Sequence, residues 1–259
     1  IRNKQGRDTQ LDRIPMGRMG QMKIVVNGDS FTHERHFAVD DSYLEKTWAY
    51  NIGAENLALG GCSNDRIFHT TIEYLNEKHP DILIIGWTHN DRYSMTHADG
   101  LNLHIIPGSV SNDLLYGWNK GEDDLAEYGE FYYRKMCNPF LNFKRFLSYY
   151  THLEKYCASN NIKFLNFTSF YLPSGIELRK IAETAYMSRE DKDIENQGIK
   201  YNTDILKNKL ATFKKENWIN NEIGFSYSKQ VEHLPKWHDG HPGLEASALW
   251  ASIIKKNIH

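Results

Sequence analysis

The chain has 259 residues, a formal net charge of −2, 40% hydrophobic residues and 25% charged residues. This balance is ordinary for a globular protein and gives no overall basic field of the kind that binds nucleic acid. No apolar run approaches the roughly 18 residues of a membrane span, so we expect neither nucleic acid nor a membrane as a partner. Three scattered cysteines and the lack of a secretory signal favour a cytoplasmic location.

Residues 1–22 differ from the rest of the chain. They are polar and glycine-rich, and they show no hydrophobic periodicity. We interpret them as a flexible N-terminal extension. Because basic residues outnumber acidic ones there, a basic arm that contacts an acidic partner is the alternative.

The next part of the chain alternates short apolar runs with stretches of helical spacing. In chain order, the pattern predicts strands at 24–26, 56–59 and 81–87. A helix at 42–52, which Gly53 ends, lies between the first two strands. A second helix, which Ser63 or Asn64 caps and Pro80 ends, lies between the last two. The run at 81–87 is apolar on both faces, which indicates a central strand of a parallel sheet.

The second half of the chain is less regular. Residues 94–138 are rich in Gly, Asn, Asp and Tyr and predict an inserted loop region. Helical spacing resumes at Pro139, and a strand is predicted at 162–167. Polar residues 173–230 predict helices in pieces. The apolar positions of the three predicted helices are Phe140, Phe143, Leu147, Tyr150 and Cys157, then Ile205, Leu206, Leu210 and Phe213, and finally Leu244, Ala248, Ala251 and Ile254.

Strands that alternate with helices predict an α/β fold with a doubly wound parallel sheet. We expect residues 23–259 to form one domain with insertions at about 94–138 and 173–230. Folds of this class bind ligands at the carboxyl ends of their strands. Four stretches fall at such ends or just before the last helix: 27–30, 59–64, 86–91 and 236–243.

These four stretches contain the parts of a nucleophilic site. Ser30 offers a hydroxyl, and a weak oxygen nucleophile needs a base such as His241 to take its proton. Asp239 is placed to orient that histidine, as in a Ser-His-Asp arrangement. Gly61 can bring its backbone N–H close to a ligand, and Asn90 offers a side-chain amide as a second donor. Taken on its own, "NGDS" is better explained as a polar turn, and only the other three stretches favour a nucleophile.

The same stretches resemble, in order, the four sequence blocks of the SGNH or GDSL-type hydrolases. The matching residues are "NGDS" at 27–30, "NLALGGCSND" at 56–65, "GWTHND" at 86–91 and "DGHPG" at 239–243. The resemblance spans residues 23–257 and implies a three-layer α/β/α, flavodoxin-like fold. It also implies an esterase without a cofactor or metal. Ser30 would be its nucleophile and His241 its general base. The N–H groups of Ser30 and Gly61, with the Asn90 side chain, would form the oxyanion hole.

Two positions depart from the family pattern. Thr88 stands where the family usually has the Asn of its third block, so either Thr88 or Asn90 completes the oxyanion hole. We group Asp29 with these substrate-binding candidates. Asp239 precedes His241 by two residues instead of three, so a backbone carbonyl is the alternative partner for the imidazole.

The resemblance also suggests a substrate, namely a small-molecule or glycan ester such as a carbohydrate O-acetyl ester. Transfer of the acyl group to an acceptor other than water is a close variant. "NGDSFT", "GGCSNDRI", "IIGWT" and "GHP" are further similar to SGNH-like proteins of viruses, which suggests a viral source. The sequence indicates no oligomeric state.

Two other functions remain open at this point. The first is a catalytically silent SGNH scaffold that serves a virus as a binding or structural component, such as part of a virion. The second is a metal-dependent phosphoesterase with ligands among Asp29, Asn90, His238, Asp239 and His241.

Cys62 has no indicated base, so we expect a small buried thiol there. For the aromatic residues at 128–133 we expect packing, with stacking on a sugar as the alternative.

Overall fold

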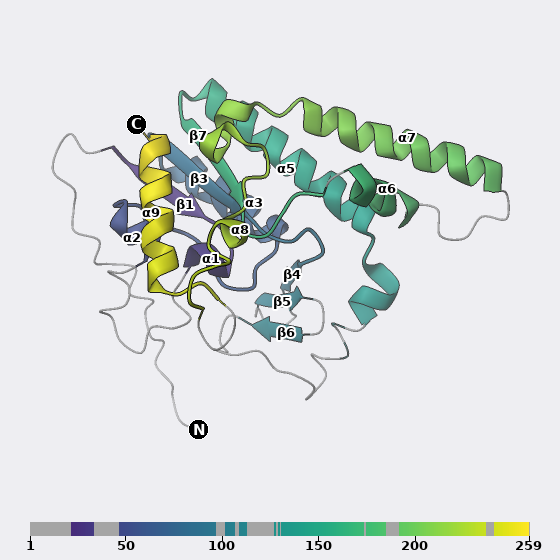
Figure 1. Cartoon of the computed structure of the whole chain (residues 1–259), viewed down its shortest axis with the longest axis horizontal. Helices are drawn as coiled ribbons and strands as arrows, with labels where there is room; N and C mark the ends of the chain where they lie inside the picture. The colour runs from purple at the N-terminus through teal and green to yellow at the C-terminus, as the bar shows by residue number, and fades with distance from the viewer. Residues whose placement is uncertain are drawn as a thin grey trace.

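The structure is a computed structural model. It describes residues 22–33, 47–96, 102–106, 109–112, 127, 129, 131–173, 175–184, 192–236 and 241–258. The expected extension therefore lies almost wholly outside the described residues. The predicted α/β fold is confirmed, because four parallel strands form a central sheet with helices on both faces (Figure 1). The strand order is β2-β1-β3-β7, the order of flavodoxin-like sheets.

The central sheet consists of β1 (Ile24–Asn27), β2 (Glu55–Asn56), β3 (Ile82–Trp87) and β7 (Lys163–Thr168). β3 is buried along its whole length and pairs with β1 on one side and β7 on the other, so the predicted central strand is confirmed. β2 is shorter than expected from the sequence. Isolated parallel bridges from Asn166 to Trp218 and from Thr168 to Ser226 extend the sheet beyond β7.

The helices are α1 (Ser30–His33), α2 (Trp48–Asn51), α3 (Asn64–Glu77), α5 (Pro139–Ser159), α6 (Gly175–Glu183), α7 (Lys192–Ala211), α8 (Tyr227–Gln230) and α9 (Leu244–Ile258). Short 3-10 turns occur at Lys215–Asn217 and Ile219–Asn221. Gly53 ends α2 with a φ of 72°, and Ser63 caps α3 by accepting from the Arg66 N–H, both as predicted. The part of the expected helix before residue 47 lies outside the described residues.

Alternate residues of the strands feed two hydrophobic clusters, one on each face of the sheet. Val25 and Leu83 pack with α3 and α5, whereas Val26 and Ile84 pack with α2 and α9. The five apolar positions predicted for α5 are all buried. α7 extends away from the sheet (Figure 1). Of the stripe predicted there, Leu206 is buried, and so is Phe213, which follows the helix, whereas Ile205 and Leu210 are only partly buried.

Two sequence-based expectations are wrong in detail. The region 94–138 is more regular than a loop, because β4 (Tyr93–Thr96), β5 (Asn102–Ile106) and β6 (Ser109–Asn112) form an antiparallel sheet, followed by a π-helix at Tyr132–Met136. In α9, Leu244 and Ala248 are exposed. The buried face is rotated by about one residue toward Trp250, whose large ring determines which side faces the sheet.

We predict that Gly86→Ala destabilises the fold. A Cβ on Gly86 would lie 2.5 Å from Phe167 Cζ and 2.7 Å from Thr32 Oγ1, and this overpacking costs about 1–3 kcal/mol. Chemical denaturation measures the loss. Phe167→Leu removes the nearest ring atoms, so the double variant should lose less than the sum of the single variants. Wild-type stability of Gly86→Ala would contradict the close packing at this point of the sheet.

Candidate active site

The carboxyl end of β1 carries the serine that the sequence singled out. Ser30 is the first residue of α1 and is 2% exposed. His241 comes from the loop before α9, 211 residues later, and its Nε2 lies 2.9 Å from Ser30 Oγ. This is hydrogen-bond distance between a hydroxyl and an imidazole, the spacing that a serine nucleophile and its base require.

The His241 ring packs against an aromatic group. Phe31 directly follows Ser30, and its ring centroid lies 5.5 Å from that of His241. Phe31 in turn meets Phe170 and Tyr227 edge-on, at 5.1 and 5.7 Å. The imidazole is therefore supported from one side by a ring whose own position is set by two further rings.

The residue expected to orient His241 lies outside the described residues. Residues 237–240, with His238 and Asp239, are not described. Both the role of Asp239 and the alternative of a backbone carbonyl stay predictions.

Asp29 directly precedes the serine and is fully buried. Its Oδ2 accepts from Thr88 Oγ1 at 2.7 Å and from Arg92 Nη1 at 3.1 Å. Its Oδ1 accepts from Ser169 Oγ at 2.6 Å and from the Phe31 N–H at 3.1 Å. The Asp29 carboxylate thus accepts hydrogen bonds from four donors of the chain itself, although we grouped it with the substrate-binding candidates. This geometry makes Asp29 a positioning residue for the turn that carries Ser30.

Sequence reasoning missed two partners of Asp29. Arg92 neutralises the buried carboxylate, and its guanidinium lies over the Phe170 ring at 5.1 Å. Ser169 follows β7 and reaches Asp29 across the strand ends. A buried carboxylate needs donors or a charge partner, but the sequence does not show that Asp29 is buried, so it gave no signal for either residue.

The two candidates for the third oxyanion donor differ in what their side chains do. The single proton of the Thr88 hydroxyl goes to Asp29, so this group has none left for a substrate. Asn90 Oδ1 accepts from Asn64 Nδ2 at 3.0 Å, and Asn64 also binds the Thr88 backbone at both N–H and carbonyl. The amide group of Asn90 is therefore oriented with its Nδ2 donor pointing away from Asn64. Asn64 is a positioning residue that the sequence suggested only as a helix cap.

The loop that carries Gly61 is bound to the end of β1. Leu59 N–H and Cys62 Sγ both donate to the Gly28 carbonyl, at 3.2 and 3.3 Å. Gly61 is buried with a φ of 75°, a conformation that most side chains disfavour, so a glycine is favoured there. At the far end of the loop, Ser63 N–H donates to Ser94 Oγ on β4.

Cys62 does not have the environment of a nucleophile. Burial raises the pKa of its thiol to about 12, because the thiolate would be deprived of water. The expected buried thiol is confirmed.

The part of the chain that the structure describes contains no group of three or more His, Cys, Asp and Glu side chains arranged to hold a metal. Asp29, a ligand candidate in the phosphoesterase alternative, has both oxygens engaged by protein donors. Nor does any described helix combine the length and apolar character needed to cross a membrane.

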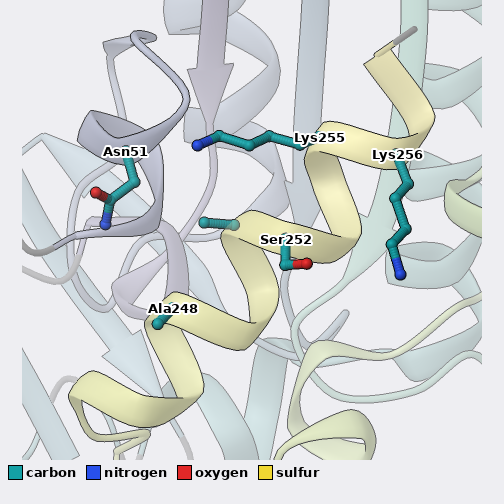
Figure 2. Close-up of a pocket in the computed structure, with 6 residues that line it drawn as sticks. Asn51, Ala248, Ser252, Lys255 and Lys256 are labelled. Carbon is teal, nitrogen blue, oxygen red and sulfur yellow. The ribbon is translucent and has the colours of Figure 1, made fainter.

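A separate pocket of about 630 Å³ lies between α2 and α9 (Figure 2). Its lining consists of Asn51, Ala248, Ala251, Ser252, Lys255 and Lys256. Neither Ser30 nor His241 contributes to it. The pocket is thus distinct from the serine–histidine pair.

No family model matches the sequence, and no curated protein matches it. In structure the chain is similar to TesA, with 13% identity and a TM-score of 0.44 over 92% of this chain and 98% of that one. It is also similar to a GDSL-like lipase from Bacteroides thetaiotaomicron, with 13% identity and a TM-score of 0.45 over 92% and 87% of the two chains. A third similar structure is a catalytic mutant of Axe2, an acetylxylan esterase from Geobacillus stearothermophilus. Its sequence identity is 13% and its TM-score 0.44, over 92% of this chain and 94% of that one.

At these identities and scores the likeness says nothing about chemistry or substrate, which we infer from the chain's own side chains. It does not bear on a viral source, which stays a prediction.

We predict that Asp29→Asn strongly destabilises the protein. Removing one partner of a buried ion pair leaves the other charge uncompensated, at a cost of about 3–5 kcal/mol. Glu183→Gln is the matched control, because the Arg179–Glu183 pair is exposed on α6 and should matter by less than about 1 kcal/mol. Equal losses in the two variants, measured by denaturant unfolding, would contradict the role of Asp29.

We also predict that alkaline pH lowers stability partly through Cys62. The unfolded thiol loses its proton near the ordinary pKa of 9.0, whereas the folded one keeps it to about 12. The free energy of unfolding should therefore fall as pH rises above about 9, and fall less in Cys62→Ala. Denaturant midpoints at pH 8 and pH 10.5 measure this. Rapid alkylation of Cys62 in the folded protein at pH 8 would contradict its burial.

Proposed function

We propose that this protein is an ester hydrolase that forms an acyl-enzyme on Ser30. The observation that carries the proposal is the 2.9 Å hydrogen bond between Ser30 Oγ and His241 Nε2, formed by residues 211 positions apart. A hydroxyl and an imidazole in this contact form the reactive unit of serine hydrolases.

In the first half-reaction, His241 Nε2 takes the Ser30 proton while Oγ bonds to the ester carbonyl carbon. The carbonyl oxygen becomes an oxyanion. As the tetrahedral intermediate collapses, the bond from carbon to the alcohol oxygen breaks, and His241 returns its proton to that oxygen. Water then repeats the sequence on the acyl-enzyme and releases the acid. An acceptor alcohol in place of water would make the same site an acyltransferase.

For the oxyanion, we assign the backbone N–H groups of Ser30 and Gly61 and the side chain of Asn90. Asn90 is preferred over Thr88, because the Thr88 hydroxyl is committed to Asp29. For the imidazole, Asp239 or a backbone carbonyl would stabilise the positive charge that develops. We propose small acyl esters, carbohydrate O-acetyl esters among them, as the substrate class.

We predict that a fluorophosphonate adds one phosphonyl group to the folded protein, and that Ser30→Ala abolishes the adduct. The reagent reacts with a serine hydroxyl only where a base activates it. On any ester that the protein hydrolyses, Ser30→Ala and His241→Ala should each lower kcat by roughly 10⁴-fold or more. Intact-protein mass spectrometry and initial rates measure the two effects.

Ser148→Ala is the matched control for this experiment. Ser148 is exposed on α5, and its hydroxyl donates only to the Lys144 carbonyl of its own helix. This variant should be labelled like the wild type. A folded wild-type protein that gains no adduct would count against the proposed function and favour a catalytically silent scaffold.

A further inference from the structure

A run of aromatic rings leads from the serine–histidine pair to the protein surface. From His241 the ring centroids follow one another at 5.5 Å to Phe31, 5.1 Å to Phe170, 6.3 Å to His89 and 6.5 Å to Tyr171. The last residue is 57% exposed, and the His89 side chain is 40% exposed. The run therefore ends in two accessible rings, which follow the carboxyl ends of β3 and β7.

The sheet explains why these rings meet. His89 follows β3, and Phe170 and Tyr171 follow β7, so they come from two strands that pair with each other in the central sheet. The chain at Phe170 is held in place, because its carbonyl accepts from the hydroxyl of Ser226 and also from that of Ser228. Tyr171 is thus an exposed ring on an anchored backbone.

The hydrogen bond at His89 determines what this side chain can offer. Its Nδ1 accepts from the Asp91 N–H at 3.3 Å, so the neutral ring carries its proton on Nε2. Burial lowers the pKa of His89, which favours the neutral form at neutral pH. His89 is thus a neutral N–H donor beside an exposed aromatic face.

The charges around these rings favour an uncharged ligand. Arg92 lies over Phe170, but its charge compensates Asp29. Asp91 Oδ2 lies 3.8 Å from His89 Nδ1 and would repel an anion at this position. A carboxylate or phosphate therefore finds no free cation among these side chains.

We infer that His89 and Tyr171 form a subsite for the alcohol part of the ester, and that this alcohol is a neutral sugar. The inference rests on the proposed function, since it assigns the half of the substrate that leaves Ser30. An aromatic face packs on the C–H face of a sugar ring, and a neutral N–H donates to one of its hydroxyl or ester oxygens. Tyrosine supplies this contact area at little cost in conformational entropy.

The test compares glucose pentaacetate with ethyl acetate as substrates, by pH-stat, in the full-length protein. The quantity compared is the ratio of two kcat/KM values, that for glucose pentaacetate divided by that for ethyl acetate. Tyr171→Ala should lower this ratio by about tenfold, mainly by raising KM for the sugar ester. His89→Phe should lower the ratio about three- to tenfold, and His89→Gln, which keeps an N–H donor, should recover part of it. Tyr201→Ala, an exposed tyrosine on α7, should leave the ratio unchanged.

An unchanged ratio in Tyr171→Ala and His89→Phe would overturn the subsite and leave the esterase proposal standing. A folded wild-type protein that gains no phosphonyl adduct and hydrolyses no ester would instead overturn the proposed function. Saturation-transfer NMR with xylotriose on the Ser30→Ala variant tests the subsite separately from the esterase activity, because this variant can bind a sugar without hydrolysing an ester. Binding that disappears in Ser30→Ala/Tyr171→Ala supports the subsite, and no binding of xylotriose or glucose to Ser30→Ala overturns it.

Discussion

The buried carboxylate of Asp29 is the interaction on which the candidate site depends. An isolated charge at 0% exposure would cost several kcal/mol, so the chain must supply donors to it. Those donors come from the loop after β3 (Thr88 and Arg92) and from the end of β7 (Ser169). Satisfying one charge therefore ties the ends of three neighbouring strands together. Ser30, the residue next to Asp29, is held where those strand ends meet.

This network explains why β1 ends in Gly-Asp-Ser instead of an ordinary turn. Gly28 allows close approach, since a Cβ there would lie 2.3 Å from Thr32 Oγ1. Asp29 also begins α1, because its side chain accepts from the Phe31 N–H and its carbonyl from Thr32 and His33. The serine then projects from the first residue of a short helix toward His241.

Much of the fold was predictable, because buried strands and amphipathic helices leave periodic patterns in the sequence. The run at 81–87 is apolar on both faces, which predicts a central strand, and β3 lies in the interior of the sheet. The antiparallel sheet β4–β6 was missed, because its strands bury residues such as His104 that look polar in a sequence. The partners Arg92, Ser169 and Asn64 were missed for another reason. Their roles depend on contacts between strand ends, and a single sequence does not show which distant side chains meet.

A crystal structure of the protein after reaction with an ethyl phosphonate inhibitor tests the role of Ser30 most directly. We expect phosphorus bonded to Ser30 Oγ, with the phosphoryl oxygen within hydrogen-bond distance of the Gly61 N–H and Asn90 Nδ2, and His241 beside the ester oxygen. A phosphonate bonded to another residue, or a phosphoryl oxygen that neither Gly61 nor Asn90 contacts, would contradict it.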